Sequence, residues 1–346
     1  MRLPEAVSGW VGPLVRTVGV ILAALLLTLG LLVVTGYDLL DCLRAFWAGT
    51  FGTRYGWGGM LTAACPLLLT GLAVAIAFRC GALNIGAEGQ FLVGALWATA
   101  VGVSLSLPRW AFLPLLFFLG ALGGALWAAV AAALRVWRGV PEVLSTILLN
   151  FIAVEWVKYA VTGPLEIVPG TAQTAELPAS GRLWMLDRTT DLHGGVLLAP
   201  VAAALLYLLL YRTTVGLEMR AVGSNPTAAR YAGISVSANL FRTMLLSGGL
   251  AGFAGVVELT GRMYGLTQGS TDLGYGYTAI AVAMLARLHP LGVIASAWFF
   301  GALASGSREM SFAPTYVPDQ LIEVVRGLMI LLSIGYGVVE LSFRKD

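Results

Sequence analysis

Residues 77–98 read AFRCGALNIGAEGQFLVGALWA, an apolar stretch with a polar centre. Its two ends are as apolar as a membrane-spanning helix, but its middle holds an arginine, an asparagine, a glutamate, a glutamine and three glycines. Ionisable residues inside a membrane segment are costly and glycine weakens a helix, so the cluster needs a reason. Two interpretations fit: a turn between two membrane helices, or a broken helix whose polar edge faces a transport path.

The two interpretations assign different roles to the same residues. As a turn, Arg79 ends one helix at the cytoplasmic face, Asn84 caps the next helix, and Glu88 complements the dipole of that helix. The glycines that let the chain reverse or unwind are Gly81, Gly86 and Gly89. As a broken helix, the stretch presents Asn84, Glu88 and Gln90 to the solute.

The rest of the chain has the composition of a membrane protein. Of its 346 residues, 58% are hydrophobic and 11% are charged, and the mean hydropathy is +0.84. A soluble protein carries roughly 25% charged residues. The net charge of +3 gives no indication of a nucleic-acid partner. We therefore predict an all-α polytopic membrane protein.

Ten apolar runs, separated by polar, proline or glycine breaks, predict about ten membrane-spanning helices, some short or broken. They cover residues 17–36, 58–78, 84–103, 110–134, 142–162, 195–211, 239–259, 274–287, 291–306 and 321–341. Basic residues gather in one set of loops and chain ends, which predicts that both termini are cytoplasmic. Residues 1–346 are expected to form a single transmembrane domain, with a long outer loop at 163–194 and a long inner loop at 212–238.

The inner loop contains LEMRAVGSNPTAARYAGI, residues 217–234, which predicts a helix of about two turns. Ser224 or Asn225 can cap it, Pro226 suits its first position, and Gly233 suits a left-handed stop. So short a helix is marginal in water and needs a surface, which either a partner protein or lipid headgroups can supply. The side chains expected to meet that surface are Ala228, Ala229, Tyr231 and Ile234, with charge from Arg220 and Arg230.

Several polar residues fall within or beside the predicted spans. Glu155 lies in the span 142–162 with Asn150 five residues before it. It faces a solute pathway, forms a buried ion pair, for example with Arg326, or lies at the rim of the membrane. Glu258, Arg262 and Asp272 are expected at the outer mouth, in contact with a binding protein or with solvent.

The segment GLTQGSTDLGYGY, residues 265–277, is rich in glycine and is expected to be partly unwound. Non-helical backbone at membrane depth is tolerated where it is buried or lines a cavity. Tyr275 and Tyr277, with Tyr264 nearby, suit stacking on a nucleobase or sugar face, although packing would explain them equally.

Enzyme chemistry finds little support in the sequence. The three cysteines and the two histidines, His193 and His289, form no nucleophile, metal-ligand or disulfide pattern. The only lysines, Lys158 and Lys345, do not follow a glycine, so the chain lacks the Gly-Lys-Ser/Thr of a phosphate-binding loop.

Four long motifs occur in order along the chain. They are FRCGALNIGAEGQFLVGA (78–95), GVPEVLSTILLNFIA (139–153), RAVGSNPTAARYAGI (220–234) and GYGYTAIAVAMLARLHPLGVI (274–294). Together they resemble the inner-membrane permease subunits of bacterial ABC importers of the branched-chain amino acid/ribose permease superfamily, and look closest to its nucleoside and simple-sugar branch. Leu83 stands where that family commonly has Phe, and Pro141 where Asn is frequent.

The resemblance implies a multi-subunit importer of the bacterial inner membrane. Its expected partners are a cytosolic ABC ATPase, a second permease that is a paralogue or an identical copy, an extracytoplasmic solute-binding lipoprotein and the lipid bilayer, but no nucleic acid. This chain would bind no cofactor, because ATP and Mg²⁺ belong to the ATPase. The residues that would couple to that ATPase are Arg220, Asn225, Pro226, Arg230, Tyr231 and Gly233.

The predicted function is thus import of a nucleoside or related simple sugar by alternating access. The expected pathway residues are Asn84, Glu88, Gln90, Asn150, Glu155, Tyr275 and Tyr277. Two alternatives stay open: a permease for another small polar solute, such as a branched-chain amino acid, or an ATP-independent transporter or channel with Glu155 or Glu88 as an ion site.

Overall fold

The protein is all-α apart from one short hairpin in the part of the chain that is described. A computed structural model describes residues 32–312 and, outside them, residues 26, 30, 315–318, 320, 321, 324, 327, 328 and 331. Strands β1 (Met185–Asp187) and β2 (Leu192–His193) pair antiparallel. The helices are α2 (Leu39–Trp47), α3 (Arg54–Arg79), α4 (Ala87–Gly102), α5 (Arg109–Arg138), α6 (Glu142–Val161), α7 (Gly195–Arg212), α8 (Thr214–Ser224), α9 (Pro226–Tyr231), α10 (Val236–Glu258), α11 (Tyr275–Leu285) and α12 (Pro290–Met310).

Eight of the ten predicted spans coincide with helices, and the first and last predicted spans, 17–36 and 321–341, lie largely outside the described residues. Within residues 32–312, six helices are long and apolar enough to cross a membrane: α3, α5, α6, α7, α10 with its extension to Met263, and α12. The polytopic all-α class is therefore confirmed, whereas the count of ten and the cytoplasmic termini stay predictions. Helices α4 and α11, of 16 and 11 residues, are too short to cross a membrane alone.

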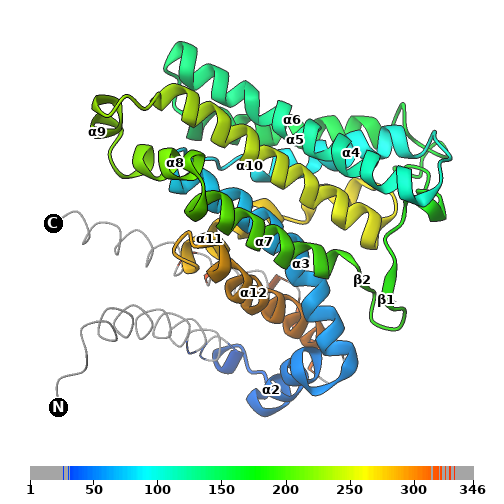
Figure 1. Cartoon of the computed structure of the whole chain (residues 1–346). Helices are drawn as coiled ribbons and strands as arrows, with labels where there is room; N and C mark the ends of the chain where they lie inside the picture. The colour runs from blue at the N-terminus through cyan, green and yellow to red at the C-terminus, as the bar shows by residue number, and fades with distance from the viewer. Residues whose placement is uncertain are drawn as a thin grey trace, which may run out of the picture. The chain divides into compact units, whose positions relative to one another are not determined.

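The chain divides into two compact units, Leu61–Gly301 and the remainder, Met1–Met60 with Ala302–Asp346. In the larger unit, α10 packs along α4 and α5 (Figure 1). Glycines make this packing close: a methyl group on Gly94 of α4 would overlap Gly252 of α10, and one on Gly124 of α5 would overlap Gly248. Small residues of this kind let membrane helices approach backbone to backbone, where dispersion forces act.

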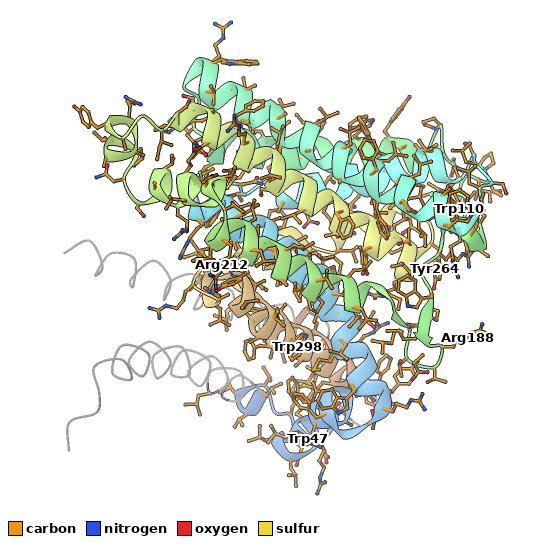
Figure 2. The ribbon with its side chains drawn as sticks, viewed as in Figure 1. Trp47, Trp110, Arg188, Arg212, Tyr264 and Trp298 are labelled. Atoms are coloured by element: carbon orange, nitrogen blue, oxygen red, sulfur yellow. The ribbon has the colours of Figure 1, made fainter. Side chains whose placement is uncertain are left out.

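The larger unit has two distinct ends. The short helix α9 lies at one end of the bundle, and the β1–β2 hairpin lies at the other (Figure 1). Trp110 and Tyr264 lie at the β1–β2 end, and Arg212 lies toward the α9 end (Figure 2).

The predicted outer loop, residues 163–194, is ordered and covers the β1–β2 end. It contains the 3₁₀ turn η2 (Ala179–Gly181) and lies against the segment that follows α10. That segment consists of the π-helical turn η3 (Leu259–Met263) and the 3₁₀ turn η4 (Gln268–Asp272). Backbone hydrogen bonds join the two: Thr174 N to Leu266 O at 2.9 Å, Leu177 N to Tyr264 O at 2.7 Å, and Leu183 N to Thr260 O at 2.8 Å.

The smaller unit contains α2, the π-helical turn η1 (Ala48–Gly52) and the end of α12. The Ser305 hydroxyl donates to the Gly49 carbonyl at 2.7 Å, and a methyl group on Gly306 would overlap the Phe46 ring. Cys42 and Met310 belong to its buried apolar cluster.

Candidate functional site

The stretch between α3 and α4 starts with a tight turn at Gly81. Gly81 has φ +79°, and its N–H donates to Phe78 O at 3.1 Å while Ala82 N–H donates to Ala77 O at 3.0 Å. This is the Schellman pattern that ends a helix at a left-handed glycine. The predicted turn at Gly81 is confirmed. Gly86 and Gly89 have negative φ and serve close packing instead, against Thr146 and Asn150 of α6.

After the turn, the chain passes through the interior and not along the surface. The Asn84 and Gln90 side chains form a reciprocal amide pair, with both N–H···O distances 2.9 Å. The Asn84 amide also donates to Ser247 Oγ at 2.8 Å, and Ser247 in turn donates to the Ala73 carbonyl of α3 at 2.6 Å. Asn84, Gln90 and Ser247 are at most 1% exposed. The amide pair therefore joins α3, α4 and α10 through a fully buried hydrogen-bonded group.

Asn150 ties α6 to the same region. Its carbonyl oxygen accepts from Gly89 N at 2.9 Å, and its amide donates to Ile85 O at 3.0 Å and to Tyr277 Oη at 3.4 Å. Asn150 has no exposed surface. Buried unwound backbone must find polar partners, and Asn150 provides one donor and one acceptor for that purpose.

Glu88 serves a second helix in addition to the one expected. It lies in the first turn of α4, but its Oε2 accepts from Gly276 N of α11 at 2.6 Å, and the amides of Gly274 and Tyr277 lie near the carboxylate. A methyl group on Gly276 would overlap the Glu88 backbone, so the two helix starts are in direct contact. The carboxylate thus stabilises the positive N-terminal ends of two helices at once. Its other oxygen, Oε1, makes no hydrogen bond within the described residues.

We call Asn84, Glu88, Gln90, Asn150 and Ser247 the buried polar network. Ser247 stands at the middle of α10, which runs from Val236 to Glu258, so the network lies at mid-height in the bundle. The half-length helices α4 and α11 both begin at the network. The position at mid-height supports the broken-helix interpretation of the opening stretch. Asn84 Oδ1 also accepts from the N–H of Gly86, the N-cap residue of α4, at 2.9 Å, so Asn84 bonds the start of α4 as the turn interpretation expects.

A second buried cluster lies between the network and the β1–β2 end. Glu258 Oε1 accepts from Arg262 Nη1 at 3.0 Å and from the Tyr275 hydroxyl at 3.2 Å, and Arg262 also donates to Tyr275 Oη at 3.1 Å. Glu258 is fully buried, which differs from the expected solvated or docking position at an outer mouth. Tyr275 also meets the Phe91 ring at 5.6 Å. The two expected tyrosines therefore differ, because Tyr275 is held in this cluster while Tyr277 is 42% exposed beside Asn150.

Glu155 stands apart from both clusters. Its side chain is 72% exposed and pairs with Lys158, one turn later in α6, at 3.0 Å. The expected buried ion pair is therefore wrong, and Arg326, the suggested partner, lies outside the described residues. A pathway role for Glu155 stays a prediction.

The inner loop folds as α8 followed by α9, and its predicted caps are confirmed. Asn225 accepts from Thr227 N and Ala228 N, each at 3.0 Å, Pro226 is the first residue of α9, and Gly233 has φ +83°. Tyr231 is 90% exposed, Arg230 is exposed, and Ala229 is buried. The face that α9 offers to a partner is therefore centred on Arg230 and Tyr231.

Arg220 makes its contacts with α7 of the same chain, and its role in coupling to the ATPase stays a prediction. It lies on α8, where its Nε donates to the Leu210 carbonyl at 2.9 Å and its guanidinium lies 5.0 Å from the centre of the Tyr211 ring. A cation that bonds the last carbonyls of a helix stabilises the end of that helix. Arg220 therefore holds α8 against the end of α7 and is not part of the exposed α9 face.

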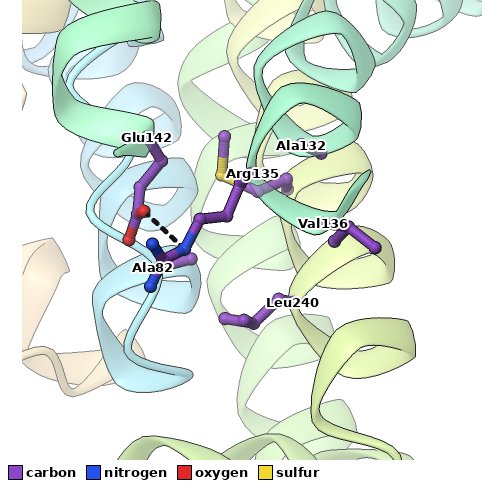
Figure 3. A pocket seen from close by; sticks show the side chains of 7 residues that line it. Ala82, Ala132, Arg135, Val136, Glu142 and Leu240 are labelled. Carbon is purple, nitrogen blue, oxygen red and sulfur yellow. Dashed lines mark ion pairs between the residues drawn. The ribbon is translucent and has the colours of Figure 1, made fainter. Parts of the chain in front are cut away.

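Two further features escaped sequence reasoning. Glu142 pairs with Arg135 at 3.1 Å and accepts from Leu83 N at 3.4 Å, beside a small pocket between α5, α6 and α10 (Figure 3). His193 is fully buried beneath the β1–β2 end, where burial and the positive charge of Arg262 lower its pKa to about 4, against an opposing effect of Asp191. The only sign of the Arg135–Glu142 ion pair in the sequence was that the two opposite charges flank the turn between α5 and α6. Nothing in the sequence distinguished His193.

Half-length helices that meet at a buried polar network, inside a bundle of membrane-length helices, define a polytopic transport protein. No group of three or more metal-ligating side chains occurs among the described residues. Residues 56–334 match the family described as branched-chain amino acid transport system / permease component, and the chain belongs to this family.

Characterised relatives cover nearly the whole chain. The chain is 36% identical to the guanosine ABC transporter permease protein NupP of Bacillus subtilis over 87% of each chain. It is 36% identical to the glucose ABC transporter permease protein TsgB13 of Haloferax volcanii, over 91% of this chain and 85% of that one. It is 30% identical to the nucleoside ABC transporter permease protein NupB of Lactococcus lactis, over 90% and 87%.

A second permease named for the same solutes in B. subtilis and in L. lactis, NupQ and NupC, is also similar, at 29% and 30% identity. No solved structure matches the chain.

Proposed function

We propose that the chain is the membrane-spanning permease subunit of an ABC importer that brings nucleosides or related sugars into the cytoplasm. The observation that carries the proposal is its 36% identity to a guanosine permease over 87% of each chain. Two further relatives, named for glucose and for nucleosides, support the choice of sugars and nucleosides as the solutes. The half-helices α4 and α11 supply a physical basis for a pathway at mid-height, since broken helices are what transporters use to offer backbone and polar groups to a solute.

The buried polar network is the proposed solute path. Its side chains are bonded to one another in this structure, which therefore corresponds to the closed state in this proposal. In an open state, the amides of Asn84, Gln90 and Asn150 would exchange their mutual hydrogen bonds for bonds to solute hydroxyls or ring nitrogens. Glu88 Oε1 has no hydrogen-bond partner among the described residues and can therefore accept from a solute. Tyr277 stands at the edge of the network, where its ring can stack on a flat solute.

The Glu258–Arg262–Tyr275 cluster closes the path toward the β1–β2 end, which we assign to the outer face. The loop 163–194 at this end would receive the solute-binding lipoprotein. Both chain termini would be cytoplasmic, on the same side as α9, in the inner membrane of a bacterium.

The exposed face of α9, Arg230 with Tyr231, is the proposed seat for a cytosolic ATPase. The ATPase would bind ATP and Mg²⁺, and the permease would perform no covalent chemistry. The existence of two similar permeases in B. subtilis and in L. lactis supports a second permease as partner. Movement of the docked α9 would open the path to one side and then to the other.

Uptake in proteoliposomes tests the proposal. The permease is reconstituted with its cognate ATPase, second permease and binding protein, and [³H]guanosine uptake is measured with ATP, without ATP, and with an ATPase that cannot hydrolyse it. The proposal predicts uptake only with active ATPase, competed by other nucleosides or by glucose. Uptake that persists without hydrolysis would instead favour an ATP-independent transporter.

A further inference from the structure

Tyr211, near the end of α7, contacts three other elements at the α9 end of the bundle. Its hydroxyl accepts from Arg79 Nη2 at 2.8 Å, at the end of α3. Its ring lies 5.0 Å from the Arg220 guanidinium of α8 and 5.4 Å from the ring of His289, in the turn between α11 and α12. One side chain therefore meets α3, α8 and the end of α11.

Gly223 forms a second direct contact with α3. It lies at the end of α8, two residues before the Asn225 cap of α9, and a methyl group there would overlap the carbonyl of Arg79. The next residues, Cys80 and Gly81, form the turn that starts the unwound stretch. Because the contact is between two backbones, a shift of α8 presses on this turn with no flexible side chain between them.

The contacts of Tyr211 and Gly223 connect α8 to the segments that contain the half-helices α4 and α11. The Arg79–Gly81 turn is the start of the segment that carries Asn84 and then α4. His289 follows the end of α11, whose other end is bonded to Glu88 of α4. Helix α8 therefore contacts the start of the first broken segment directly through Gly223, and reaches the end of α11 through Arg220, Tyr211 and His289. The other ends of the two segments meet at Glu88.

We propose that Tyr211 and Gly223 are positioning residues that pass movement of α8–α9 to the two half-helices, so that both broken segments shift together. The inference rests on the proposed function, since it needs a partner ATPase to move α9. Arg220 fits this role too, because it is half-buried and joins α8 to Leu210 and Tyr211 of α7.

A change at these positions should alter coupling more than folding. Misfolded molecules lower ATP hydrolysis by the complex and solute uptake together, so the ratio of the two is unaffected by loss of protein. A broken mechanical link lets the ATPase turn over without moving the half-helices, which lowers only the uptake per ATP. Changes along such a link typically alter coupling by roughly 2- to 30-fold.

The experiment compares four variants in the complete reconstituted importer, with [³H]guanosine as the probe. Tyr211→Leu removes the ring and the hydroxyl, Tyr211→Phe removes only the bond to Arg79, and Gly223→Ala forces α8 off the Arg79 carbonyl. Tyr207→Phe is the matched control, one turn earlier in α7, because it keeps the ring contacts with Tyr211 and His289.

We expect guanosine imported per ATP to fall by roughly 2- to 30-fold in Tyr211→Leu and Gly223→Ala, less in Tyr211→Phe, and not in Tyr207→Phe. A ratio equal to wild type in Gly223→Ala and in either Tyr211 variant overturns the inference, as does an equal fall in Tyr207→Phe. If Tyr211→Leu does not accumulate in the membrane, the guanosine imported per ATP by Tyr211→Phe and Gly223→Ala tests the inference. ATP-independent uptake by the unaltered importer, measured first, would contradict the proposed function and is a separate outcome.

Discussion

Two short helices of this protein follow an asparagine, and the two asparagines differ in how far along the chain their partners lie. Asn225 stands before α9 on the surface and bonds the N–H groups two and three residues later, Thr227 and Ala228. Asn84 stands before α4 in the interior, where its partners include Gln90 and Ser247, the latter 163 residues away. Asn84 also accepts from Gly86 N, two residues later, at 2.9 Å, so both asparagines bond the start of the next helix. Only Asn84 also joins helices that are distant in sequence.

The difference separates what local chemistry can specify from what packing must supply. A cap needs only the residues that follow it, so the cap of α9 could be recognised from Asn-Pro alone. A buried amide must find all its partners in the folded bundle, because an unpaired one costs free energy. The network around Asn84 should therefore be stiff and stability-determining, while α9 should be tolerant of change and specialised for docking.

The sharpest contrast is expected between Asn84→Ala and Asn225→Ala. Asn84→Ala leaves both polar atoms of the Gln90 amide without their partner, at roughly 1–3 kcal/mol for each buried polar group left unpaired. Asn225→Ala removes an exposed cap worth about 1 kcal/mol to α9 alone. Thermal unfolding of the purified protein in detergent measures both. Equal melting temperatures for the two variants would break the comparison.

A smaller effect is expected when the exposed face of α9 is changed. Tyr231→Ala should weaken co-purification of the cognate ATPase by roughly 30-fold, as loss of an aromatic anchor does, without change in the melting temperature. Arg230→Glu should act in the same direction. Thr227→Ala, also exposed on α9, is the control and should bind normally. Full retention of the ATPase by the double variant Arg230→Glu/Tyr231→Ala would show that α9 is not the seat.

The smallest effect is expected from pH at the β1–β2 end. The pKa of His193 is lowered from 6.5 to about 4, so the unfolded chain takes up the proton first as the pH falls. The contribution of neutral His193 to stability is thus complete above pH 6.5 and is lost as the pH falls from 6.5 through about 4. His193→Gln should flatten this part of the stability profile in detergent. A profile as steep as that of the unaltered protein would argue against a buried neutral imidazole.

The sequence predicted the helices well because their apolar runs are set by the membrane. It also predicted α9 with its caps. Local patterns could not show that Glu88 of α4 would bond Gly276, which lies 188 residues later, or that Asn84 would meet Ser247. They also gave Arg220 a docking role and Glu155 a possible buried partner, since the direction in which a helical side chain points depends on its neighbours.

The most direct test of the account is guanosine uptake by Glu88→Gln in the complete importer. The amide oxygen of Gln can still accept from Gly276 N, so α11 keeps its bond, while the charge is lost and the free acceptor Oε1 becomes a different group. The account predicts uptake reduced by roughly 10- to 100-fold, the size of a lost hydrogen bond to a charged group, with ATPase binding retained. The melting temperature should fall only by the loss of the charge that stabilises the N-terminal ends of α4 and α11. Uptake at the unaltered level, with normal expression, would contradict a solute path through the buried polar network and leave Glu88 with a structural role alone.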